Sequence, residues 1–97
     1  MFDHTGRIVR ADAGRDKGGI LCVVGMDGER QLLLLADGRR RKAARPKAKK
    51  LGHVTVLTGP DRPWEHPVIG KLKRGEPVSD RELRRALCAF KEGETLG

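Results

Sequence analysis

Aromatic side chains are scarce in this sequence. Phe2, Trp64 and Phe90 are its only three, and it contains no tyrosine. Proteins that bind flexible single strands mainly by stacking bases on aromatic rings use more of them than this. That class of protein is therefore disfavoured. We expect Trp64 to pack on the barrel formed by the strands, with base stacking as the alternative.

Metal-binding and membrane-spanning patterns are also missing. The two cysteines, Cys22 and Cys88, are too far apart for a metal motif, and the three histidines show no ligand spacing. The longest apolar run, residues 32–36, is far shorter than the roughly 20 residues needed to cross a bilayer. No signal-peptide pattern is found at the start. These absences predict a soluble, reduced, cytoplasmic protein without a metal, a cofactor or a membrane partner, and with Cys22 as a buried free thiol.

Signatures of catalysis are absent as well. No paired carboxylates, Cys–His pair or phosphate-binding loop stands out, so neither an enzymatic activity nor a small-molecule substrate is predicted. The 97 residues form one small domain. Its core is expected to be thin, because a chain of this size buries only roughly 60–65% of its unfolded surface.

What the chain does contain is a dense block of positive charge at residues 39–50. Eight of these twelve residues are Lys or Arg and none is acidic, while the other 13 basic residues match the 13 acidic ones in number. The whole net charge of +8 therefore resides in this block. Like charges repel, and the block becomes favourable when it meets a polyanion and releases the polyanion's counterions. The block predicts a contact surface for a nucleic acid, presented by the rest of the chain.

Other interpretations of the block remain open at this level. Runs of like charge are often solvated tails without a specific partner, and a nuclear-localisation signal has the same local appearance. A membrane-surface segment fits poorly, since only alanines interleave with the bases and Pro46 interrupts a helix.

Short segments rich in branched apolar residues predict strands separated by glycine turns. The predicted strands are residues 7–11, 20–24, 31–36 and 51–57, and the first residues of the basic block could add one more. A turn is predicted at 25–28, with Asp27-Gly28 as the hairpin signal, and Asp37-Gly38 predicts a second turn. Short strands at this spacing favour a small barrel formed by residues 1–58, so the fold class is mainly β.

A C-terminal helix is predicted over residues 79–92. Residues 59–78 hold four of the five prolines and are expected to be a surface connector. Ser79 and Glu82 form a capping box at the start of the helix, and Gly93 is a natural stop. One face should pack on the barrel and cover the outer side of the leucine run 32–35; its members are Leu83, Ala86, Leu87 and Phe90. The other faces extend the basic surface with Arg81, Arg84, Arg85 and Lys91.

Several segments in order resemble the KOW-domain RNA-binding proteins, above all the small bacterial members that look like eukaryotic-type large-subunit ribosomal proteins. The matching stretches are the loop Ala13-Gly14-Arg15-Asp16-Lys17-Gly18 with the strand after it, residues 36–42, residues 45–51 with His53, and residues 82–87. The loop alone is weak evidence, whereas the ordered combination covers most of the chain. Arginine and alanine stand at several block positions where the family would have lysine, which alters contact geometry because arginine binds as a planar fork.

The resemblance implies an SH3-like (KOW) barrel, with the C-terminal α-helix packed on it, whose glycine loop approaches RNA, often ribosomal RNA. The partners it implies are RNA and the ribosome, in translation. The implied RNA-binding residues are Arg15, Lys17, Gly18, Arg39, Arg40, Arg41, Lys42, Arg45, Lys47, Lys49, Lys50 and His53. From the residues themselves, a glycine-rich turn flanked by Arg15 and Lys17 predicts a nest of backbone N–H groups for an anion; a plain hairpin loop is the alternative.

Two rival functions remain. Phosphates are common to DNA and RNA, so a DNA-binding or nucleoid-like protein fits the basic block equally well. An adaptor that docks on transcription or translation machinery through its C-terminal helix would expose Leu83, Leu87 and Phe90.

Overall fold

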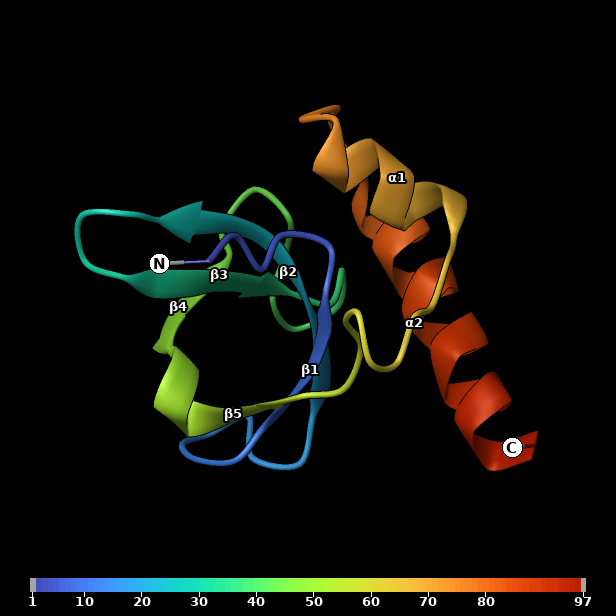
Figure 1. Ribbon diagram of the computed structural model, residues 1–97, viewed down its shortest axis with the longest axis horizontal. Coiled ribbons are helices and arrows are strands. Elements are labelled where there is room, and N and C mark those ends of the chain that lie inside the picture. The colour runs from blue at the N-terminus through green and yellow to red at the C-terminus, as the bar shows by residue number, and fades with distance from the viewer. Residues whose placement is uncertain (1, 97) are drawn as a thin grey trace.

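The computed structural model describes the backbone of residues 2–96 and the side chains of residues 2–93. Its elements are β1 (Ile8–Ala11), β2 (Ile20–Asp27), β3 (Leu32–Ala36), β4 (Lys47–Lys50), the 3-10 helix η1 (Leu51–His53), β5 (Val54–Val56), α1 (Pro67–Lys73) and α2 (Asp80–Leu96). The strands form one antiparallel sheet in the order β4-β3-β2-β1-β5, with the two helices on one side of it (Figure 1). The predicted mainly β class with a packed C-terminal helix is confirmed.

The sheet is strongly curled. Its two edge strands, β4 and β5, are joined only by the three residues of η1. The edges of a flat five-stranded sheet would be about 19 Å apart, and four peptide steps reach at most about 14 Å. The edges must therefore approach each other at this end, although no ladder joins them in the described strands, so the sheet is not a closed barrel.

Two cores lie on opposite faces of the sheet, because neighbouring side chains of a strand point to opposite sides. The inside of the curl holds Val9, Ala11, Leu21, Val23, Leu33, Leu35 and Val54. The outer face packs against both helices through Ile8, Cys22, Ala36, Val68, Ile69, Leu72, Leu83, Ala86, Leu87 and Phe90. The predicted packing face of α2 and the predicted buried thiol of Cys22 are thus confirmed.

The position of α2 on the sheet differs from the prediction. The helix packs on β2, and of the neighbouring strand β3 it covers Ala36 rather than the leucine run. Leu33 and Leu35 point into the curl, while Leu34 is half-buried in a groove between β3 and the chain that leads into α2.

Four predicted boundaries shift, each for a local reason. The β2 strand continues through a bulge between Val23 and Gly25, so the hairpin turn lies at 28–31 rather than 25–28. The last residues of the basic block, not the first, form the added strand, and the predicted strand 51–57 is shortened by η1. Helix α2 passes through Gly93 to Leu96, because a glycine costs a helix only about 1 kcal/mol.

The predicted connector 59–78 contains a helix that sequence reasoning missed. The His66 side chain caps α1 by accepting a hydrogen bond from Val68 N. Pro67 occupies the first helical position, where its missing N–H group is no loss. The capping box of α2 forms as predicted: Glu82 N donates to Ser79 Oγ, and Ser79 N donates to the Glu82 carboxylate. Within residues 2–96, no helix combines the length and the apolar character needed to span a bilayer.

Candidate nucleic-acid interface

The glycine loop between β1 and β2, residues 12–19, is closed by its own hydrogen bonds. Lys17 N donates to Gly14 O, Gly18 N to Ala11 O and Gly19 N to Asp16 O. Gly14 and Gly18 have positive φ, which lets the chain turn this tightly. Since these three N–H groups are already used, the predicted anion nest is wrong for them. The exposed side chains of Arg15 and Lys17 remain available for phosphate contacts from this loop.

An ion pair ties this loop to the basic block. The Arg41 guanidinium donates to both oxygens of Asp16, with Nη2 at 2.9 Å from Oδ2 and Nε at 3.2 Å from each oxygen. The Asp16 side chain is only 7% exposed, whereas Arg41 is 29% exposed. Hydrogen bonds from Arg41 hold the pKa of Asp16 below its ordinary value, against the opposing effect of burial. A two-pronged pair in this environment fixes geometry as well as charge.

A second tie comes from β4. Lys49 pairs in register with Leu33 of β3 and is buried, and its Nζ donates to Ala13 O at 2.5 Å. The alkyl stem of Lys49 therefore lies over the inner core while its charge reaches the loop backbone. Of the twelve residues predicted to bind RNA, Arg41 and Lys49 thus have intramolecular partners that hold the loop and the block together.

Strand geometry divides the remaining β4 bases. Because side chains alternate, Lys47 lies on the same face as Lys49, and Lys50 lies on the opposite face with Ala48. Both Lys47 and Lys50 are exposed. The block is therefore no single stripe of charge: its strand half points in two directions.

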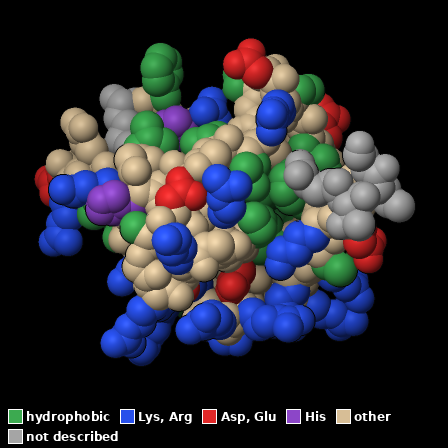
Figure 2. Space-filling view, turned by 90° about the horizontal axis from the view of Figure 1, so that it is seen from below, with side chains coloured by type: hydrophobic (Ala, Val, Ile, Leu, Met, Phe, Trp, Pro, Cys, Tyr) green, Lys and Arg blue, Asp and Glu red, His purple; other side chains and the backbone are tan. Residues whose placement is uncertain are grey.

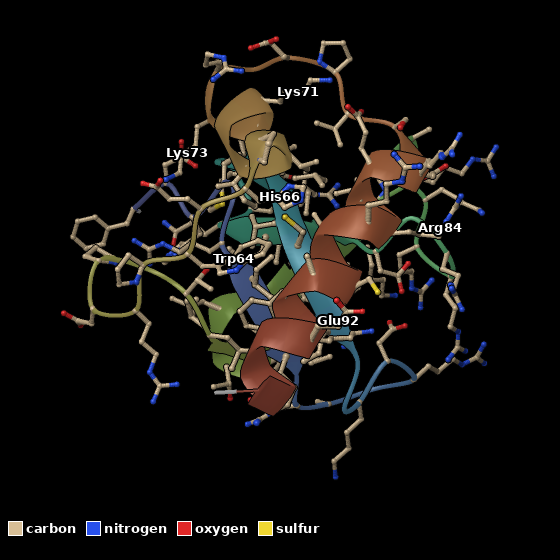
Figure 3. The ribbon with its side chains drawn as sticks, turned by 90° about the vertical axis from the view of Figure 1, so that its right-hand side faces the viewer. Trp64, His66, Lys71, Lys73, Arg84 and Glu92 are labelled. Carbon is tan, nitrogen blue, oxygen red and sulfur yellow. The ribbon has the colours of Figure 1, made fainter. Side chains whose placement is uncertain are left out.

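The other half of the block, the turn formed by residues 37–45, is docked on α2. Asp37 Oδ1 accepts hydrogen bonds from Arg39 N at 2.8 Å and Arg41 N at 2.9 Å, which shapes the turn. Gly38 has φ +78° and is so close to the helix that a Cβ there would be 2.2 Å from Asp80 O. Arg84 Nη1 donates to Gly38 O at 2.8 Å (Figure 3).

One further bond completes this docking. Asp80 Oδ1 accepts from Ala43 N at 2.7 Å. Residues 37–45 are thus held on one side by the glycine loop, through Arg41, and on the other side by the first turns of α2. This segment is an integral part of the fold rather than a free arm.

These ties bring together the charges that remain exposed. We define the basic surface as the exposed Lys and Arg residues of the loop and the block: Arg15, Lys17, Arg39, Arg40, Lys42, Arg45, Lys47 and Lys50. None of them forms an ion pair with an acidic side chain of residues 2–93. Lys and Arg side chains gather along the lower edge of the molecule in Figure 2, with few acids among them.

Two further residues predicted to bind RNA, Gly18 and His53, are exposed but are not Lys or Arg. Gly18 is exposed in the glycine loop. His53 is exposed on η1, and its carbonyl oxygen accepts from Asp12 N at 2.9 Å, which brings η1 beside the start of the loop. Both positions are compatible with contact to a bound polymer.

The structure also tests three features outside the basic surface: the apolar face of α2, Trp64 and a metal site. Leu83, Leu87 and Phe90 are at most 5% exposed, so the exposed apolar face that the adaptor alternative requires is not found on α2. Trp64 is half-buried and packs against the outer core, as predicted in part, but its ring partners are His66 at 5.5 Å and Phe90 of α2 at 5.3 Å rather than the strands (Figure 3). Among the described residues, no group of three or more His, Cys, Asp or Glu side chains could hold a metal ion.

Sequence reasoning missed the acidic side chains that organise the site. Asp16, Asp37 and Asp80 each accept hydrogen bonds from the basic block or its backbone. Of these, only Asp37 carried a signal, through its Asp-Gly pair. Compared with known proteins, the chain matches no family model and no curated protein.

Proposed function

We propose that the chain is a non-catalytic RNA-binding protein that binds folded RNA, such as ribosomal RNA, through backbone phosphates. One observation carries this proposal. Two segments far apart in sequence are fixed against each other by the Arg41–Asp16 and Lys49–Ala13 contacts, and their remaining bases are exposed and not paired with described acids. Charges held at fixed spacing can bind phosphates held at a matching spacing. Such binding loses little conformational entropy, because the charges are already positioned.

The kind of polymer follows from the rigidity and composition of this surface. Recognition of unpaired RNA relies on bases stacked on aromatic rings or arginine planes. Trp64 and Phe90 make packing contacts, and Phe2 is the one largely exposed aromatic side chain among the described residues, so backbone contacts are the main resource. Folded RNA presents phosphates and 2′-hydroxyls in a fixed array, and duplex DNA is the nearest competitor.

The resemblance to KOW proteins supports the same proposal. In that interpretation the curled sheet is an SH3-like barrel, the loop 12–19 is the KOW turn, and the protein acts in the cytoplasm on the ribosome or in translation. The order of the matching segments supports it, as do the loop and the block lying against each other. Such a protein needs neither a cofactor nor a small-molecule substrate.

A competition experiment tests the choice of polymer. A folded ribosomal RNA fragment, an unstructured RNA of equal length and a duplex DNA compete for the protein at near-physiological salt. The folded RNA is expected to bind most tightly. Equal affinity for all three would reduce the interaction to general charge attraction, and a preference for the unstructured strand or for DNA would overturn the proposal.

A charge-matched pair of variants tests the surface. Replacing Arg39, Arg40 and Lys42 with Ala removes three exposed charges from the turn and spares Arg41. By counterion release, each lost phosphate contact weakens binding by about fourfold to fivefold at 0.15 M salt, or about 50- to 150-fold for three. The slope of log affinity against log salt should fall by about 2 to 3.

The control variant loses the same charge elsewhere. Arg30, Arg62 and Lys73 are exposed on the β2–β3 turn, the segment before α1, and α1 itself. Their triple alanine variant should bind folded RNA nearly as well as the unchanged protein. Equal losses in the two variants would mean that net charge, rather than the basic surface, determines binding.

A further inference from the structure

The flank of α2 beside the docked turn is a second basic feature that the proposed function does not use. With 3.6 residues per turn, the core-facing residues Leu83, Ala86, Leu87 and Phe90 occupy one side of the helix. On one border of that side, Glu82 binds Lys71 of α1 at 2.5 Å. On the other border, Asp80 and Arg84 hold the turn 37–45. Arg81 and Arg85 are exposed on the side of the helix opposite the core, about 60° and about 100° around the axis from Arg84.

A groove runs between the turn and this flank. Its charged and nucleophilic lining residues are Asp37, Arg39, Arg84, Cys88, Lys91 and Glu92. Figure 3 shows Arg84 projecting from α2 towards the turn. Residues of the turn and residues of α2 both line this groove, so the basic surface and the helix flank are adjacent.

The acids of this region are largely engaged within the protein. Asp37 accepts two backbone N–H groups of its own turn, and Asp80 accepts Ala43 N. Glu82 binds Lys71 and Ser79 N on the far border. Arg81 and Arg85 form no ion pair with an acid of residues 2–93. Arg81 and Arg85 thus add positive charge beside the turn, while Glu92, which accepts a hydrogen bond from Cys88 Sγ at 3.7 Å, adds one negative charge at the groove.

We propose that bound RNA continues from the turn 37–45 across the groove onto α2, where Arg81 and Arg85 bind backbone phosphates next to those held by Arg39 and Arg40. Arg84 is a positioning residue in this arrangement, because its guanidinium holds Gly38 O. The inference rests on the proposed function and deepens it: the partner is an RNA whose folded backbone spans both the β1–β2 loop side and the helix side of the docked turn.

The cysteines allow a test in the unaltered protein. Cys88 is exposed in the groove, whereas Cys22 is buried and burial raises its pKa to about 12. A thiol reagent should therefore modify Cys88 alone. With folded RNA at about ten times its Kd, about one protein in eleven stays free, so alkylation should slow about tenfold. It should recover at high salt, where the RNA is released. An unchanged rate at saturating RNA would overturn the inference.

A second test uses substitutions that leave the fold intact. Arg81→Ala combined with Arg85→Ala should weaken binding about 15- to 30-fold at 0.15 M salt by loss of two phosphate contacts, with the salt slope reduced by about 2. The control combines Arg30→Ala with Arg62→Ala and should change neither quantity. The melting temperature of both variants should match the unchanged protein, because all four side chains are exposed.

The outcomes separate this inference from the proposed function. If the unchanged protein binds folded RNA and both double variants bind equally well, the helix flank is not part of the interface and the proposed function stands. If the unchanged protein shows no preference for folded RNA, the proposed function fails and the inference fails with it.

Discussion

The chain contains two Asp-Gly turns with the same local sequence signal and opposite surroundings. Asp27-Gly28 forms an exposed hairpin tip, where a Cβ on Gly28 would meet nothing within 4 Å. Gly38 of the second pair is buried against α2, where a Cβ on it would be 2.2 Å from Asp80 O. In each turn the aspartate accepts backbone N–H groups: Arg30 N in the first, and Arg39 N and Arg41 N in the second.

The difference shows what a turn signal leaves undetermined. Local hydrogen bonding makes an Asp-Gly pair turn, because the aspartate oxygen satisfies the N–H groups that follow it. Whether the turn is free or docked depends on a segment more than 40 residues further along. In this protein the docked turn carries part of the basic surface, so under the proposed function its position would affect RNA binding as well as stability.

The largest difference in stability is expected between the Gly38→Ala and Gly28→Ala variants. Gly38→Ala places a side chain at positive φ, which costs about 1–2 kcal/mol, and forces the turn away from α2, which costs about 1–3 kcal/mol more. Gly28→Ala should stay within about 0.5 kcal/mol. Chemical denaturation of both variants measures the difference. Equal stability would mean that the contact between the turn and the helix is not required for the fold.

Removing the support beneath the turn should come next in size. Leu87 is 3% exposed, belongs to the outer core and lines the groove under Asp37 and Arg39. Leu87→Ala should lower the free energy of unfolding by about 2–4 kcal/mol, as for other buried leucines. A urea titration checks this. If α2 were loosely attached, the substitution would have almost no effect.

Breaking the tie on the other side of the turn should cost somewhat less. Arg41→Ala leaves the carboxylate of Asp16 buried without its partner, and bonds to charged groups are worth about 1.5–3 kcal/mol. Arg30→Ala, whose pair with Asp27 is exposed at 3.9 Å, should cost at most about 0.5 kcal/mol. Thermal melts of the two variants test the contrast, and similar melting temperatures would contradict it.

The smallest expected effect is a pH dependence. The pKa of Asp16 is lowered in the folded state, so its stabilisation is present above the unfolded value of about 4 and is lost as pH falls through the folded value. The stability difference between the unchanged protein and Arg41→Ala should therefore be largest near pH 7. It should shrink below about pH 4, because Asp16 then becomes protonated. A difference that stays constant from pH 7 to pH 3 would assign the effect to packing rather than charge.

Local patterns in the sequence predicted much of the fold. Alternating and branched apolar segments gave four of the strands to within a few residues, and the Ser79–Glu82 capping box gave the start of α2. Tertiary context decided the rest. The bulge at Gly25 prolongs β2, and the position of α2 over β2 depends on how the sheet curls. Helix α1 had a signal in His66-Pro67 that proline-rich surroundings concealed.

The candidate site was predictable in composition and less so in geometry. The charge count located the basic block, but identical side chains within it have different surroundings. Arg39 and Arg40 are exposed and Arg41 binds Asp16. Lys49 is buried against Ala13 between exposed neighbours. Strand alternation turns Lys49 inward, and Arg41 is held by an acid 25 residues away. The number of charges in the block predicts neither effect.

The contact between Gly38 and Asp80 also constrains the order in which the molecule matures during synthesis. The turn 37–45 emerges from the ribosome before the residues that dock it: Asp80, which accepts Ala43 N, and Arg84, which donates to Gly38 O. Chains fold progressively from the N-terminal side as they are made. A nascent chain that stops short of residue 79 can form the strand pairings and the Arg41–Asp16 pair but lacks the contacts that dock this turn on α2. Under the proposed function, the arrangement of cations that includes this turn would be complete only after α2 has been translated.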